Sequence, residues 1–144
     1  MIYFCNLNFL KLTLPLMNIA ITHGISVSVD TYFNFSQSTL KESLYLFNYH
    51  ITIENKNNFP VQLKNREWLV YDSLDIPKII KGEGVIGEQP TLQPGEVYSY
   101  TSSCNLISPI GYMQGHYTFI NTNTNEDIIV MIPKFTLNYP GVLN

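Results

Sequence analysis

The chain has 144 residues, of which 45% are hydrophobic and 13% are charged, and its formal net charge is −3. A chain of this length buries roughly two-thirds of its unfolded surface as one domain, and its low charge content excludes a disordered, highly charged polypeptide. The small negative charge also excludes a strongly basic surface of the kind that holds nucleic acid by its phosphates. We therefore expect a single folded domain with no nucleic-acid partner.

Residues 1–16 form an apolar stretch that fits neither a membrane span nor a secretory signal. The stretch is too short to cross a bilayer, and its one charged residue, Lys11, lies inside the apolar run instead of before it. We expect Met17 to be the true start, so that residues 1–16 are a non-native or disordered extension and residues 17–144 form the domain. A membrane-proximal tail and an extra edge strand are the alternatives, and the intact mass of the natively expressed protein tests the choice.

From residue 21 onward the chain consists of short apolar runs separated by Asn, Gly, Pro and Ser, which is typical of all-β proteins. Alternation is cleanest between Tyr45 and Ile53, where apolar side chains occupy every second position. The expected strands are 21–35, 44–54, 61–72, 77–81, 97–104, 115–121 and 127–137. Pro133 places the last of them at a sheet edge or breaks it. Because no long segment keeps a helical period, we predict a two-sheet immunoglobulin-like or fibronectin-III-like sandwich of about seven strands.

The strand expected at 61–72 contains a change of phase. Val61 and Leu63 start one alternation, and Arg66 and Trp68 start another that is displaced by one residue. Such a slip predicts a β-bulge near residues 64–65, which would re-aim the arginine and the tryptophan.

The reactive side chains form no recognisable catalytic or metal-binding pattern. Cys5 and Cys104 form no CxxC pair, and the histidines are too widely spaced for a zinc site. No general base can be placed beside Cys104 or the serines at 102–103, so we do not expect an enzyme. Carboxylates such as Asp72 and Glu83 could offer oxygens to a magnesium or cobalt ion, but they form no dedicated cage and we expect no cofactor. The absence of an obvious cysteine pair favours a reduced, cytoplasmic protein.

Several stretches in a fixed order resemble the bacterial ApaG family. They are THGISVSV (22–29), VQLKNREWLVYD (61–72), GEGVIGEQP (82–90), LQPGE (92–96), YTSSCNL (100–106), SPIGYMQGHY (108–117) and IPKFTL (132–137). The resemblance covers nearly everything from Met17 onward, and it implies a fibronectin-III-like sandwich with no known catalytic mechanism. It also implies a link to cobalt and magnesium resistance, and a relation to domains that act as partner-binding modules. Glu67 departs from the family pattern, in which His is common.

Residues 82–87 match the pattern GxGxxG through Gly82, Gly84 and Gly87. In a dinucleotide-binding unit, such glycines let backbone amides approach a pyrophosphate at a helix N-terminus. Here no helical pattern follows the motif, so the favoured interpretation is that the glycines supply positive φ angles for a tight β connection. The alternative is a nucleotide or dinucleoside-polyphosphate site made by these glycines together with Arg66, which is the best single candidate for contact with an anion.

The candidate contacts with a protein partner are Tyr112, Met113 and Trp68. Residues 109–115 (PIGYMQG) are expected to form an exposed loop with Tyr112 and Met113 at its tip, and aromatic residues are favoured in protein interfaces. The alternative for Trp68 is a place in the core beneath Arg66. The leading functional hypothesis is a non-catalytic module that binds a protein partner or a second copy of itself.

Overall fold

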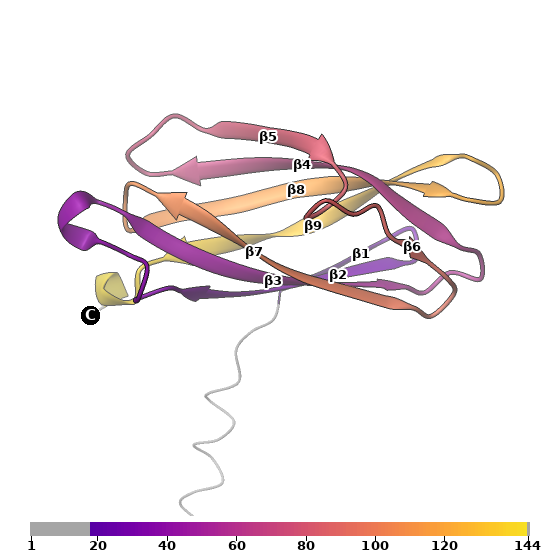
Figure 1. The fold of residues 1–144 in the computed structure, drawn as a ribbon, viewed down its shortest axis with the longest axis horizontal. Coiled ribbons are helices and arrows are strands. Elements are labelled where there is room, and N and C mark those ends of the chain that lie inside the picture. The colour runs from indigo at the N-terminus through magenta and orange to yellow at the C-terminus, as the bar shows by residue number, and fades with distance from the viewer. Residues whose placement is uncertain (1–17, 144) are drawn as a thin grey trace, which may run out of the picture.

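The computed structural model describes residues 18–143 and arranges them as a sandwich of two antiparallel β-sheets (Figure 1). The first sheet has the order β1-β2-β3-β7, and the second has the order β5-β4-β8-β9 with β6 also paired to β4. The strands are β1 (Asn18–Thr22), β2 (Ile25–Phe33), β3 (Tyr45–Asn55), β4 (Val61–Asp72), β5 (Lys78–Glu83), β6 (Thr91–Leu92), β7 (Val97–Leu106), β8 (Ile110–Asn121) and β9 (Asp127–Asn138). The predicted fold class is confirmed.

The number of strands differs from the prediction for two reasons. The run expected at 21–35 is divided by a tight turn at His23 and Gly24, where both φ angles are positive, so it forms β1 and β2. The very short β6 carries too few residues to show a period. Two short 3-10 turns, η1 (Leu40–Glu42) and η2 (Pro140–Leu143), are the helical elements of residues 18–143. The expected extension at residues 1–16 lies outside the described residues.

Alternating side chains decide which face of each strand is buried. In β3, Phe47, Tyr49, Ile51 and Ile53 are buried, whereas the residues between them are more exposed. The inward faces of both sheets meet in one apolar core. Burial of apolar surface of this kind contributes about 1.5–3 kcal/mol for each large side chain.

Two β-bulges interrupt the ladders of the second sheet. The first lies between Leu63 and Asn65 of β4, where the phase change predicts it. The second lies where β8 and β9 change register between Met113 and Gly115, opposite Pro133. Proline donates no backbone hydrogen bond, so its place beside a bulge in the edge strand β9 agrees with the prediction.

The two long sides of the sandwich differ. On one side β1 and β2 pack against β9, and the backbone amide of Met131 donates a hydrogen bond to the hydroxyl of Thr22 at 3.2 Å. On the other side lie β5 and β7, which are edge strands that pair only with β4 and β3 among the described residues (Figure 1). The sandwich is therefore closed along one side and has two strand edges along the other.

Candidate functional site

A groove of about 380 Å³ opens between the edge strands β5 and β7, and we call it the edge groove. Its floor is made of buried side chains from the core, its walls are residues of the two edge strands, and Arg66 lies at one end. The lining residues are Tyr49, Arg66, Trp68, Val70, Lys78, Ile80, residues 102–105 and Met113.

Small side chains on β7 create this groove. Ser102 and Cys104 are the inward-facing residues of β7 between the larger Tyr100 and Leu106. Opposite them lies Trp68, which is only 3% exposed. Because a serine and a cysteine cannot fill the space that two aromatic residues would occupy, the sheets are left unsealed at this point.

Arg66 is aimed into the sandwich by the bulge in β4. Its Nη1 donates hydrogen bonds to the backbone oxygens of Glu83, at 2.9 Å, and Gly84, at 2.7 Å. Gly82 makes room for the guanidinium, since a Cβ at that position would lie 2.8–2.9 Å from its atoms. No carboxylate of the described residues lies within ion-pair distance of Arg66.

The glycine loop at residues 82–87 is a β connection and leads into β6, with no helix after it. Val85 and Glu88 exchange backbone hydrogen bonds of 2.8 and 2.9 Å around Ile86 and Gly87, whose φ angles are +43° and +79°. Two central residues with positive φ are the mark of a two-residue hairpin with a type I′ turn. The amide of Gly84 also donates within the protein, to the oxygen of Lys64. The favoured interpretation agrees with the structure at Gly84 and Gly87, whose φ angles are positive, but not at Gly82, which lies in strand β5. Several backbone amides of the loop already donate hydrogen bonds within the protein.

Hydroxyl groups gather beside Arg66 inside the sandwich. The hydroxyls of Tyr100 and Tyr117 lie 2.5 Å apart and form a buried hydrogen bond. Burial raises the pKa of Tyr49, Tyr100 and Tyr117 above the ordinary value of 10.0. Burial, assisted by the charge of Asp72, likewise raises the pKa of the Cys104 thiol to about 11. These groups are therefore held in their neutral forms at neutral pH.

The structure contradicts the expectation of an exposed loop at 109–115. This stretch enters β8 at Ile110, and adjacent strand residues point to opposite faces, so Met113 is buried at 2% exposure while Tyr112 faces outward. The Tyr112 ring stacks on Tyr71 with centroids 4.8 Å apart, and Lys134 Nζ lies 3.9 Å from its centroid. Trp68 is also in the core, so neither Trp68 nor Met113 offers an exposed contact.

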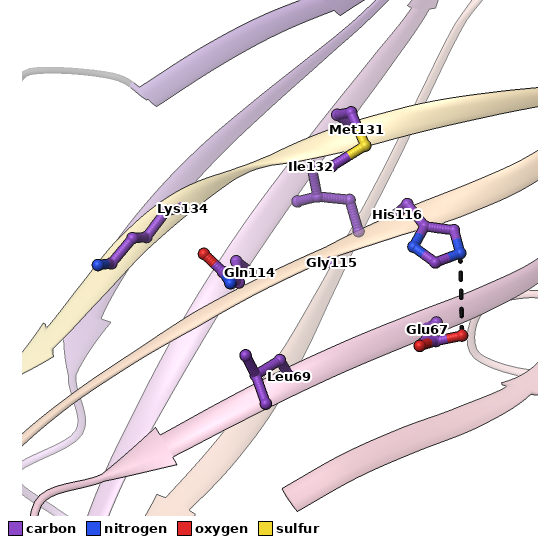
Figure 2. Close-up of a pocket in the computed structure, with 8 residues that line it drawn as sticks. All are labelled: Glu67, Leu69, Gln114, Gly115, His116, Met131, Ile132 and Lys134. Atoms are coloured by element: carbon purple, nitrogen blue, oxygen red, sulfur yellow. Dashed lines mark ion pairs between the residues drawn. The ribbon is translucent and has the colours of Figure 1, made fainter. Parts of the chain in front are cut away.

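A second hollow, of about 410 Å³, lies on the outer face of β4, β8 and β9 (Figure 2). His116 points toward Glu67, with Nε2 3.9 Å from Oε2, and Lys81 Nζ lies 3.6 Å from the same oxygen. Gly115 forms the floor, and a Cβ there would approach the backbone oxygen of Glu67 to 2.1 Å. Unlike the edge groove, this hollow is lined by a carboxylate, Glu67, as well as by a lysine, Lys134.

The predicted site residues therefore fall in three places. Arg66, Gly82 and Gly84 meet at one end of the edge groove, whose floor includes Trp68 and Met113. Gly87 lies in the hairpin turn, and Tyr112 lies on the outer face of the second sheet. Sequence reasoning missed Ser102, Cys104, Lys78 and Ile80 as groove residues. The sequence signal that could have predicted the groove is the pair of small inward residues, Ser102 and Cys104, between two large ones.

Residues 18–143 bring no three His, Cys, Asp or Glu side chains together in a way that could hold a metal ion. Within the same residues, no helix has the length and apolar character needed to cross a membrane.

The fold and the edge groove define an immunoglobulin-like, two-sheet β-sandwich protein with one unsealed side, and comparisons with known proteins give its family. The family model described as the ApaG domain matches residues 35–121. Protein ApaG of Thiobacillus denitrificans is 42% identical over 122 residues, which is 85% of this chain and 95% of the relative. Protein ApaG of Agrobacterium fabrum is 40% identical over 124 residues, which is 86% of this chain and 95% of that protein.

Solved structures agree with the sequence relatives. A crystal structure from Bordetella pertussis that carries the name ApaA superposes with a TM-score of 0.77 at 34% identity, covering 88% of this chain and 98% of that one. The chain belongs to the ApaG family, as its motifs indicate.

Proposed function

We propose that this member of the ApaG family is a non-catalytic binding module that takes an extended segment of a protein partner into the edge groove. The observation that carries the proposal is the uncovered length of β7 at residues 102–105, which lies beside an apolar floor. A strand edge presents unpaired backbone N–H and C=O groups, and an extended peptide can add to it as a further strand.

The floor of the groove supports the same proposal. Trp68, Val70 and Met113 close the bottom of the groove while staying buried, and the half-exposed Ile80 of β5 forms its far wall. Every second side chain of an added strand would point to this floor, since strand side chains alternate in direction. At about 3.3 Å per residue, residues 102–105 give pairing for about four residues of a partner.

The chemistry of the groove supports a binding role without catalysis. Cys104 is the strongest nucleophile by type among the lining residues, but burial keeps its thiol protonated at neutral pH, and a thiol is a weak nucleophile. His116 pairs with Glu67 on the outer face of the second sheet, so this histidine does not line the groove with Cys104.

A nucleotide is the second candidate, and Arg66 is the feature that favours it. The backbone amides of Gly84, Val85 and Glu88 weigh against it, because they donate to carbonyls within the protein. A phosphate site of the glycine-loop kind needs such amides free.

A role in cobalt or magnesium homeostasis and a cytoplasmic location stay predictions from the sequence.

Peptide selection with a matched pair of variants tests the proposal. Two random peptide libraries, one ending in a free C-terminus and one flanked on both sides by carrier protein, are selected on the wild-type protein. Ser102→Trp places an indole in the groove, whereas Ser99→Trp places it on the outward face of the same strand, outside the groove. We expect Ser102→Trp to weaken binding of the recovered peptides by about tenfold or more and Ser99→Trp to change their affinity by less than about twofold.

Circular dichroism of both variants confirms that the fold survives. Equal binding to the wild type and Ser102→Trp would overturn the proposal, as would the failure of both libraries to give a binder. Titration with ATP and with diadenosine tetraphosphate, each with magnesium, serves as the competing arm. Binding tighter than millimolar that is lost in Arg66→Gln would favour the nucleotide instead.

A further inference from the structure

The guanidinium of Arg66 has unused hydrogen-bond donors. Arginine carries five N–H groups, and the two bonds to the oxygens of Glu83 and Gly84 come from Nη1 alone. No hydrogen bond from Nε or Nη2 reaches a described residue, and no buried polar side-chain atom of these residues lacks a partner. The Nε and Nη2 groups are therefore accessible to solvent, and Arg66 is one of the residues that line the edge groove.

Arg66 gives the edge groove a positive charge that no ion pair among the described residues balances. Arg66 and Lys78 line it, and no Asp or Glu does. Lys78 is balanced by Asp75 at 2.9 Å, and Asp72 accepts hydrogen bonds from the amides of Leu74 and Ile107, so the charge left for a ligand is that of Arg66. In a chain with a net charge of −3, this arrangement is complementary to an anionic ligand.

The groove is blind at the Arg66 end. There the hairpin that follows β5 lies over the sandwich, with Val85 buried in the core at 1% exposure. The hydroxyl of Tyr98 donates to Glu88 at 2.9 Å and ties this hairpin to β7. Beyond Arg66 lies a smaller hollow of about 160 Å³, lined in part by Val85, Ile86 and Tyr100. A polypeptide lying along residues 102–105 of β7 has no open path past this point.

From these three observations, and resting on the proposed function, we propose that Arg66 binds the C-terminal carboxylate of the partner segment. A chain that must stop at the blind end presents its terminal carboxylate there, and a guanidinium fork matches a carboxylate in shape and charge. The bonds to the two loop carbonyls hold the guanidinium in place before the ligand arrives, which lowers the entropic cost of binding.

This placement also sets the direction of the ligand. Residue 102 of β7 lies at the Arg66 end of the groove and residue 105 at its open end. A ligand that finishes at Arg66 therefore runs antiparallel to β7, which is the pairing that β7 already makes with β3. The residues of the ligand that precede its last one lie over Trp68, Val70 and Met113.

Peptides recovered by selection, each synthesised in three forms, test the proposal. The forms are the free C-terminal acid, the C-terminal amide, and an amide whose last residue is Asp, which offers a side-chain carboxylate instead. We expect the free acid to bind the wild type about tenfold or more tighter than either amide, because charge-assisted hydrogen bonds are lost in the amide. In Arg66→Gln the ratio of acid to amide affinity falls to about one.

Two further variants keep the result interpretable if Arg66→Gln loosens the hairpin. Arg66→Lys keeps the charge but loses the fork, and we expect it to reduce the acid-to-amide ratio without abolishing it. Lys81→Gln removes a charge from the outer face of β5, the strand that pairs with β4 beside Arg66, and we expect it to leave the ratio unchanged. Thermal unfolding shows that each variant is folded.

Equal affinity of acid and amide for the wild type overturns the carboxylate inference. The proposed function survives that result if Ser102→Trp still blocks both forms. Tight binding of the Asp-terminated amide overturns the chain-end assignment, because a side-chain carboxylate would then serve. Recovery of binders from the flanked library alone would also overturn the chain-end assignment, because those peptides have no free C-terminal carboxylate.

Discussion

Arg66 differs from an ordinary surface arginine in what holds it. Its guanidinium rests on two carbonyl oxygens and over the Cα of Gly82, so its position is set by backbone and not by a carboxylate. A charge fixed in this way keeps its remaining donors for a ligand. The sequence predicts Arg66 as an anion contact, and it favours Gly82 as a glycine of a tight β connection, with a phosphate site as the alternative. The structure shows the glycine making space for the arginine, a relation that no spacing rule could reveal.

The buried tyrosines give a prediction about pH. Burial raises the pKa of Tyr100 and Tyr117, so the stability that their neutral forms provide is complete below pH 10.0 and is lost as the pH rises above it. Tyr117→Phe removes one of these groups together with the 2.5 Å hydrogen bond. We expect it to cost about 1 kcal/mol at pH 7 and to make the loss of stability above pH 10.0 shallower.

Urea titrations at pH 7 and above pH 10 measure this effect. Tyr32→Phe is the control, because Tyr32 is 54% exposed, and it should behave like the wild type at both values. A Tyr117→Phe protein whose stability falls with pH as steeply as that of the wild type would contradict the account of the buried pair.

The hairpin after β5 is the element that closes the groove, and its turn is not optimal. Ile86 adopts a φ of +43°, which is unfavourable for a β-branched side chain, and it is 59% exposed. Type I′ turns favour Asn followed by Gly, and Gly87 already occupies the second position. We expect Ile86→Asn to raise the free energy of unfolding by about 0.5–1 kcal/mol.

Urea denaturation of Ile86→Asn tests the turn assignment. The matched control is Ile129→Asn, which replaces an isoleucine that is 46% exposed in the regular strand β9. It should lower the stability or leave it unchanged, since asparagine is disfavoured in strands. A loss of stability in Ile86→Asn equal to that in Ile129→Asn would show that the turn is not strained as described.

Strands with a clear period of two are predicted well by the sequence. β4 has the predicted bounds Val61–Asp72, and the change of phase locates its bulge. The start of β8 is predicted poorly, because Ile110 and Gly111 follow a serine and a proline and look like a loop. Gly111 lies against the backbone oxygen of Tyr71, where a Cβ would approach to 2.3 Å, so its small size serves strand packing and not a turn.

The molecule as a whole is a sandwich with unequal sides. Where β1 and β2 meet β9 the sheets are sealed by side chains and by the Thr22 hydroxyl, whereas Ser102 and Cys104 leave the opposite side open. Composition and periodicity predict that two sheets pack together. They do not predict which edges stay apart, because that depends on the size of a few inward side chains seen across the sandwich.

The backbone-amide chemical shifts of the protein with a selected free-acid peptide test the central claim most directly. If the edge groove is the binding site, the largest changes lie in residues 102–105 of β7, in Lys78 and Ile80 of β5, and at Arg66. Changes centred on Tyr112 and the outer face of β4, β8 and β9, with residues 102–105 unaffected, would contradict it.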